Sequence, residues 1–246
     1  MGTSVIVAGA TGVIGRQLVP LLVEAGYSIF GTTRKRGRMA DLKAAGAEPV
    51  LLDVFDAPAL EAAFARIRPE VLIHQLTDLP HDLNPTAMPE ALVRNARIRS
   101  EGTTNLMRAA SKAGVRRVIA QSIVWLYAPG TEPHREEDPL GVADGASRVT
   151  LEGVLALERA VLLGSPIEGF VLRYGQFYGP GTINADAKGP CPVHVEAAAH
   201  AAVLAIERGR PGIYNVADDN TLVSTAKARQ HLGWDPGFRR RPRTAP

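Results

Sequence analysis

Residues 4–15 read SVIVAGATGVIG, and this stretch decides the fold. The β-branched run that opens it predicts a buried strand, and apolar residues at helical spacing predict a helix over 13–25. Between them, Gly9 permits a tight turn, Gly12 lets backbone approach a pyrophosphate, and Gly15 lets the helix pack close to the strand. The unit therefore predicts a phosphate site for a dinucleotide at the helix N-terminus, and a turn without a ligand is the alternative.

The rest of the chain repeats this alternation of strand and helix. Strands are expected at 4–8, 27–33, 49–53, 71–74, 117–122 and 169–174, and helices at 13–25, 38–45, 57–66, 87–112 and 150–163. The pattern predicts an α/β fold, a Rossmann-type doubly wound parallel sheet with helices on both faces.

Two long stretches break the rhythm, 128–147 and 174–192, and both are rich in Pro, Gly and acidic residues. Long loops at the carboxyl ends of strands are where such folds bind ligands. We expect a single domain over 1–246, in which 1–172 form mainly the dinucleotide-binding core and 173–246 mainly a small C-terminal substrate-covering region.

Composition narrows the class of protein and its partners. The formal net charge is +3, and the terminal FRRRPRTAP holds a cluster of four arginines, Arg239, Arg240, Arg241 and Arg243. No aromatic platform accompanies them, so they indicate a solvated tail and no nucleic-acid partner. No apolar run approaches the about 20 residues of a membrane span, and one cysteine excludes an internal disulfide. We expect a soluble, cytoplasmic protein with a small-molecule substrate and no membrane partner, and a homodimer is a possible assembly.

A metal centre is not expected. Cys191, His194 and His200 are the nearest set of ligand types, but the two histidines do not share one face of the expected helix well. No matching carboxylate pair accompanies them.

The end of the second expected strand indicates which dinucleotide is bound. Residues 32–38 read TTRKRGR, with Thr33 in place of the carboxylate that accepts the 2′-hydroxyl of NAD. Arg34 and Arg36 favour a 2′-phosphate, so NADP is expected over NAD, and a solvated basic helix start is the alternative. Asp53 is a candidate acceptor for the adenine amino group. The expected cofactor contacts are Gly9, Thr11, Gly12, Val13, Ile14, Gly15, Arg34, Arg36, Asp53, Val54 and His74.

Four separated motifs follow one another along the chain: GATGVIG at 9–15, LLDV at 51–54, EGTTNLMRAASKAGVRRVI at 101–119 and LRYGQFYGPGT at 172–182. With these motifs the chain resembles an extended or atypical short-chain dehydrogenase/reductase of the NAD-dependent epimerase/dehydratase type. The resemblance implies a Rossmann fold. It also implies a catalytic tyrosine, a lysine four residues on that lowers the pKa of that tyrosine, and a Ser or Thr at the end of the fifth strand.

Other residues stand at the catalytic positions that the resemblance implies. Laying the family helix onto ALERAVL at 156–162 puts Thr150 at the tyrosine position and Val154 at the lysine position. The serine position falls on Ile123, and Ser122 stands one position away. The cofactor half of the resemblance is retained, and the catalytic half is replaced.

A reductase with this site needs another proton donor, since a positioned general acid contributes on the order of 10²–10⁴ in rate. The candidate catalytic residues are Tyr127, which is favoured, Tyr174 and Ser122. Both tyrosines have an alternative role as part of a pocket wall, and His194 is expected to cap the helix that begins there. The family asparagine before the GT pair corresponds to Arg99.

Three functions are open on these residues. The first is an NADP-dependent oxidoreductase or epimerase/dehydratase-like enzyme that acts on a small organic carbonyl or alcohol with a non-standard proton donor. The second is a non-redox isomerase or lyase, and the third is a non-catalytic NADP-binding sensor or scaffold, because fold alone does not fix function. An acyl-transfer hydrolase has no support without a G-x-S-x-G motif.

Overall fold

The computed structural model describes residues 2–80, 82–141 and 145–240. Seven parallel strands form the main sheet in the order β3-β2-β1-β4-β5-β6-β9. The strands are β1 (Ser4–Ala8), β2 (Ser28–Thr33), β3 (Glu48–Leu51), β4 (Val71–His74), β5 (Arg117–Ile123), β6 (Glu168–Tyr174) and β9 (Gly212–Val216). The strand order reverses beside β1, which confirms the predicted doubly wound α/β fold.

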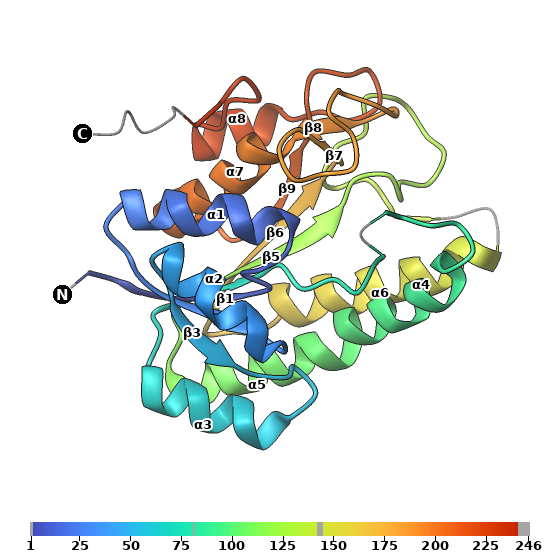
Figure 1. The fold of residues 1–246 in the computed structure, drawn as a ribbon. Helices are drawn as coiled ribbons and strands as arrows, with labels where there is room; N and C mark the ends of the chain where they lie inside the picture. The colour runs from blue at the N-terminus through green and yellow to red at the C-terminus, as the bar shows by residue number, and fades with distance from the viewer. Residues whose placement is uncertain (1, 81, 142–144, 241–246) are drawn as a thin grey trace.

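Helices cover both faces of this sheet (Figure 1). One face carries α1 (Val13–Glu24), α2 (Met39–Ala44), α7 (Val195–Glu207) and α8 (Ala226–Leu232). The other carries α3 (Ala57–Ile67), α4 (Met88–Arg97), α5 (Thr103–Ala113) and α6 (Gly145–Leu162). The short elements are a 3₁₀ turn η1 (Arg36–Arg38), a π-helical turn η2 (Ile98–Gly102) and a two-stranded sheet of β7 (Gln176–Tyr178) and β8 (Pro192–His194).

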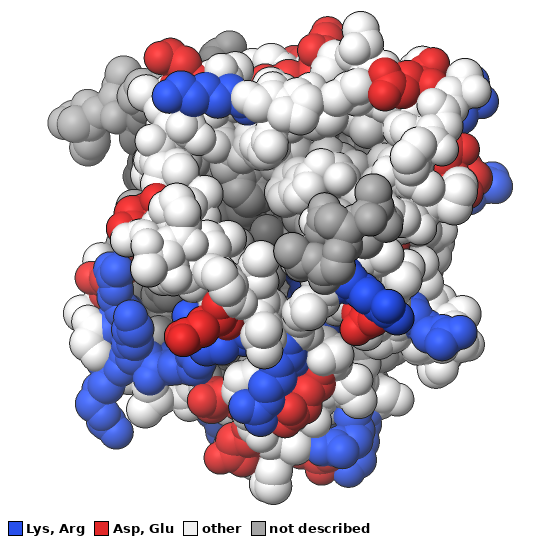
Figure 2. Space-filling view, turned by 90° about the vertical axis from the view of Figure 1, so that its right-hand side faces the viewer, with Lys and Arg blue, Asp and Glu red and all other residues white. Residues whose placement is uncertain are grey.

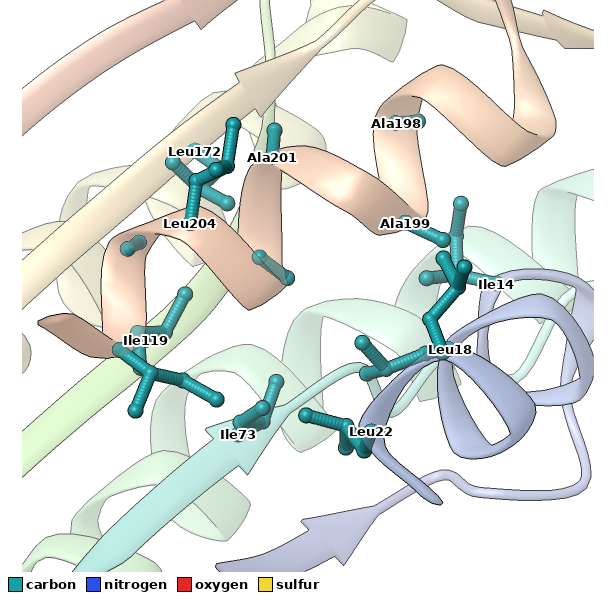
Figure 3. Packing of buried hydrophobic residues seen from close by; sticks show 14 of the residues in the cluster. Ile14, Leu18, Leu22, Ile73, Ile119, Leu172, Ala198, Ala199, Ala201 and Leu204 are labelled. Carbon is teal, nitrogen blue, oxygen red and sulfur yellow. The ribbon is translucent and has the colours of Figure 1, made fainter. Parts of the chain in front are cut away.

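The two cores follow from the alternation of side chains along buried strands. In β1, Val5 and Val7 pack toward α1 and α7, whereas Ile6 and Ala8 pack toward α3 and α5. Figure 3 shows the first core, where Leu18 of α1 lies among the alanines of α7 and the apolar side chains of the sheet. Both faces of each central strand are buried. Because β1 is held by packing on both sides, the turn that follows it is held in place as well.

The structure differs from the sequence predictions in two places. The expected helix over 87–112 is α4, η2 and α5 in succession, with the π-helical turn at Ile98–Gly102. Within the segment 173–246, β9 pairs with β6 in the main sheet and α7 packs against α1, so part of this segment belongs to the core. The strand GIYNV at 212–216 is short, and its pairing partner lies far away in the sequence, so no local pattern marked it.

The surface features expected from composition lie partly within the described residues. Arg240 pairs with Glu24 at 2.6 Å, and Arg239 donates to the carbonyl oxygen of Pro236, while Arg241 and Arg243 lie outside the described residues. Among the helices that the structure describes, none combines the length and the apolar character needed to cross a membrane.

Candidate cofactor and substrate site

A cavity of about 1250 Å³ opens at the carboxyl ends of the strands. It runs from the glycine turn after β1 to the loops that follow β4, β5 and β6, so it lies where doubly wound sheets bind ligands. Figure 2 views this side of the molecule and shows a hollow surrounded largely by uncharged residues. Most of the expected site residues line this cavity, but several do not.

The glycine turn has the geometry of a phosphate cradle. Gly9 has a φ of +89°, and the Gly12 N–H donates to the Gly9 carbonyl oxygen at 3.0 Å. Gly12 is the N-cap of α1 and has no side-chain cap, so the first N–H groups of the helix are free for an anion. The cavity is lined here by Gly9, Thr11, Gly12, Val13 and Ile14. These residues fit the pyrophosphate of a dinucleotide.

Gly15 serves packing, not the cavity. A Cβ at this position would clash with the carbonyl oxygen of Gly9 and with the backbone of Ala10, so only glycine lets α1 lie this close to the turn. Gly15 is buried and is absent from the cavity lining. Its expected role is therefore indirect, because it sets the distance between helix and strand.

The basic segment after β2 lies at one end of the cavity. Thr33 is buried, and its hydroxyl accepts the Lys35 N–H at 3.2 Å. Arg34, Lys35 and Arg38 line the cavity, whereas Arg36 does not. Residues 36–38 form a 3₁₀ turn, and the backbone of Lys35 before it is extended.

Of the expected cofactor contacts at the ends of β3 and β4, one lines the cavity and the others make hydrogen bonds within the protein. Val54 lines the cavity, but Asp53 is exposed and its carboxylate accepts the Phe55 N–H at 2.9 Å. His74 is 2% exposed and is absent from the lining. Its Nδ1 accepts the Leu76 N–H at 3.3 Å, and its Nε2 lies 3.0 Å from the Thr103 hydroxyl. His74 therefore holds the loop after β4 in place instead of touching the cavity.

Burial keeps His74 neutral. It lowers the pKa of the His74 imidazole to about 4, and the nearby guanidinium of Arg99 adds to the shift. Because Nδ1 accepts a hydrogen bond, we infer that the single ring proton sits on Nε2 and is donated to Thr103.

The positions assigned to the family triad carry no strong acid. Ile123 and Thr150 line the cavity, as the alignment of the sequence predicts for the serine and tyrosine positions. Val154, at the lysine position, is fully buried and packs against Ile123 and Leu126. This wall can orient a substrate by shape, but it offers one threonine hydroxyl and no phenol or amine.

Ser122 points away from this wall. Its hydroxyl is fully buried and donates to Oε1 of Glu158 at 2.7 Å. Gln121 and Ile123, its neighbours in β5, line the cavity, and alternation along the strand sends Ser122 to the opposite face. This placement argues against the expected catalytic role of Ser122.

Tyr127 lines the cavity with its hydroxyl engaged elsewhere. The hydroxyl donates to Asn215 Oδ1 at 2.7 Å and accepts from Arg173 Nη1 at 2.8 Å, and the ring stacks on His134. Arg173 also makes two hydrogen bonds to Glu158, at 2.7 and 2.9 Å. Burial raises the pKa of the Tyr127 phenol in spite of the nearby guanidinium. The hydroxyl is thus part of a structural network.

Tyr174 is the contrasting case. It is fully buried, lines the cavity, and its hydroxyl has no hydrogen-bond partner among the described residues. The Gln75 side chain lies close enough to affect the titration of Tyr174, but no hydrogen bond of ordinary geometry joins them, and both polar atoms of Gln75 are also without partners. Burial raises the pKa of Tyr174 above its usual range. Unpaired buried groups that line a cavity can form hydrogen bonds with a bound ligand or with water.

The Nδ1 of His194 accepts the Glu196 N–H at 3.3 Å, which confirms the predicted cap of α7. Arg99, which sequence reasoning noted only as the replacement of an asparagine, is buried and lines the cavity. Within 2–80, 82–141 and 145–240, no group of three or more His, Cys, Asp or Glu side chains could hold a metal ion.

Comparison with known families agrees with this geometry. A model of the NAD dependent epimerase/dehydratase family matches residues 5–191. The chain belongs to this family. The assignment makes it an enzyme of the NAD(P)-dependent reductase or epimerase type.

Two curated relatives are reductases. A 3-diazoavenalumate denitrifying reductase from a Streptomyces species is 39% identical over 269 residues, and the match covers 98% of this chain and 84% of that protein. A dTDP-4-dehydrorhamnose reductase from Streptomyces griseus is 30% identical over 185 residues, with 74% of this chain and 53% of that protein covered. The chain thus spans about half the length of the second relative.

Solved structures share the fold. A UDP-glucose 4-epimerase from Thermotoga maritima, solved with UDP-glucose, has a TM-score of 0.79 at 18% identity and covers 96% of this chain and 94% of its own. The enzyme WbmG from Bordetella bronchiseptica, in complex with NAD, has a TM-score of 0.72 at 20% identity and covers 95% and 89%.

Proposed function

We propose that the protein is an NADP-dependent reductase that removes nitrogen from a small diazo carboxylate. The observation that carries this proposal is the cavity wall at Ile123 and Thr150, with Val154 buried against Ile123, because these residues offer no strong acid for carbonyl reduction. A substrate whose reduction consumes no proton suits such a wall. The 39% identical relative, whose name describes a denitrifying reductase of a diazo carboxylate, supports the same chemistry.

The stoichiometry explains why no acid is required. When bound, the reduced nicotinamide supplies a hydride, and in R–N₂⁺ + H⁻ → R–H + N₂ the C–N bond breaks, dinitrogen leaves with the electron pair of that bond, and no proton is taken up. The protein then has to bind the substrate, orient it toward the nicotinamide and exclude water. The apolar side chains of Ile123 and Leu126 contribute to a water-poor wall.

The decisive experiment follows the origin of the new C–H bond. The protein is incubated with a diazotised aminocinnamate and NADPH deuterated at its transferable position, and dinitrogen release and deuterium in the product are measured. We expect one deuterium per turnover from NADPH and none at that carbon from heavy water. Oxidation of NADPH without dinitrogen release, or deuterium from solvent only, would reject the proposal.

A second candidate is a carbonyl reductase that uses Tyr174 as its proton donor. The observation in favour is the unpartnered Tyr174 hydroxyl in the cavity. Its raised pKa speaks against it, because a phenol without a neighbouring cation is a weaker acid.

Two phenylalanine variants separate these candidates. On the diazo substrate, Tyr127→Phe and Tyr174→Phe are expected to keep kcat within about threefold of the parent, because neither hydroxyl transfers a proton. If Tyr174 were a general acid, Tyr174→Phe would lose on the order of 10²–10⁴ in kcat. Steady-state kinetics of both variants decide between them, and a large loss in Tyr174→Phe with intact NADPH affinity supports carbonyl reduction.

The proposal includes a preference for NADP over NAD. Arg34, Lys35 and Arg38 place three cations on the cavity, and Thr33 brings no charge that would repel a 2′-phosphate. Arg34 is paired only loosely, at 3.7 Å from Asp78, so its guanidinium can turn to a phosphate. We expect NADP(H) to bind about tenfold or more tightly than NAD(H).

Three alanine variants test this preference. Arg34→Ala and Arg38→Ala are each expected to weaken NADPH binding about tenfold and to leave NADH binding within about twofold, because only NADPH carries the 2′-phosphate. Arg36→Ala is the matched control, since Arg36 is equally basic but does not line the cavity. Calorimetric titration measures the affinity of each variant for both nucleotides. If Arg36→Ala weakened NADPH binding as much as Arg38→Ala, the proposed contact of Arg38 with the 2′-phosphate would be contradicted.

A further inference from the structure

Arg99 is a buried cation with no hydrogen-bond partner among the described residues. It lies on the π-helical turn η2 and lines the cavity, yet only 5% of its surface is exposed. Apart from the charge of Glu158, its guanidinium has no hydrogen bond or ion pair with a residue that the structure describes. A guanidinium carries five N–H donors, and a charge buried without a partner is costly, so the site is incomplete without an anion.

The charged groups around Arg99 do not satisfy it. Glu158 acts on Arg99 through its charge, but its carboxylate is already occupied by two hydrogen bonds from Arg173 and one from Ser122. His74, the other titratable neighbour, stays neutral. Arg99 and Arg173 thus share one carboxylate, and one positive charge faces the cavity without compensation.

The position of Arg99 separates it from the phosphate sites of the cofactor. The pyrophosphate cradle lies at Gly12 and the basic segment at Arg34, both on the β1 and β2 side of the cavity. Arg99 instead lies on η2, which packs against α6, the helix that carries Thr150. It therefore belongs to the wall where the family implies substrate chemistry.

We infer that Arg99 forms an anion subsite that binds the carboxylate of the substrate. The inference deepens the proposed function and rests on it, because it treats the carboxylate as part of the substrate of the reductase. Two donors of one guanidinium match the two oxygens of a carboxylate. At this position the resemblance to the family implies an uncharged asparagine, so the guanidinium of Arg99 adds a positive charge there.

The mouth of the cavity indicates what the rest of the substrate is like. Leu83, Trp125 and Ile183 line the cavity and are 42%, 46% and 46% exposed, although large apolar side chains favour burial. A flat apolar body could cover them while its carboxylate reaches Arg99. The substrate class that fits is an aromatic or unsaturated carboxylic acid.

The test measures binding without turnover. Cinnamate and its neutral analogue cinnamamide are titrated calorimetrically into the full chain saturated with NADP. The parent protein is expected to bind cinnamate about ten- to a hundredfold more tightly than cinnamamide. Arg99→Met is expected to abolish this preference while its NADP affinity stays within about threefold, and Arg99→Lys, which retains the charge, to keep part of it.

Lys188→Met is the matched control, because Lys188 is an exposed cation that lines the same cavity. It is expected to leave the preference for cinnamate unchanged. The inference is overturned if the parent shows no preference for the carboxylate, if Arg99→Met retains it, if Lys188→Met removes it, or if Arg99→Met loses NADP affinity to the same extent. Failure of dinitrogen release would reject the proposed reaction but leave this binding result standing, so the two failures are distinguishable.

Discussion

Arg173→Met is expected to lower the free energy of unfolding by about 3–5 kcal/mol, because it leaves the buried carboxylate of Glu158 without its cation. Arg173 and Glu158 are 3% and 5% exposed and are joined by two hydrogen bonds of 2.9 and 2.7 Å. The same guanidinium donates to the hydroxyl of Tyr127 in the cavity wall. Urea denaturation followed by circular dichroism measures the loss.

An exposed ion pair on α6, the helix that also carries Glu158, provides the control. Arg148 and Glu152 of α6 are joined by a hydrogen bond of 3.0 Å but are exposed, so Arg148→Met is expected to cost less than about 1 kcal/mol. The double variant Arg173→Met with Glu158→Met should recover part of the stability, because no unpaired charge is left behind. Equal losses in Arg173→Met and Arg148→Met would show that the buried pair contributes no more than a surface pair.

Gly12→Val is expected to abolish nucleotide binding, a loss of more than about a hundredfold, in a protein that still folds. The Gly12 backbone is extended, with a φ of −75°, and its Cβ would stand 3.2 Å from the Gly9 carbonyl oxygen, so the fold can admit a side chain after a small shift. The side chain would then fill the space in front of the helix N-terminus that a pyrophosphate requires. Calorimetric titration with NADPH, beside circular dichroism, separates binding from folding.

The neighbouring glycine gives the opposite outcome. In Gly15→Val the new Cβ meets the backbone of Gly9 and Ala10, so we expect loss of the folded state and not merely of the ligand. If both variants fold and Gly12→Val still binds NADPH, the turn serves only to connect β1 and α1.

Much of the candidate site could be predicted from the sequence. The residues that could not be predicted depend on strand faces and on single turns. The residues of the glycine turn, Arg34 and the wall at Ile123 and Thr150 follow from local motifs, and the structure brings them to one cavity. Ser122 was misplaced because the face on which a strand residue lies changes with a shift of one position. Arg36 was expected to contact the cofactor, but of these two arginines only Arg38 lines the cavity, and a single 3₁₀ turn leaves no periodic pattern in the sequence.

The sequence by itself determined the doubly wound sheet, because the alternation of strands and helices depends on local spacing and residue type. Only the tertiary structure decided that the segment 212–216 completes the main sheet, that His74 supports a loop, and that Arg99 lines the cavity with no hydrogen bond to a described residue. Whether a buried charge is satisfied depends on which side chains the packed elements bring within hydrogen-bond distance. For Arg99, the nearby carboxylate belongs to Glu158, 59 positions along the chain. This carboxylate already accepts hydrogen bonds from Arg173 and Ser122.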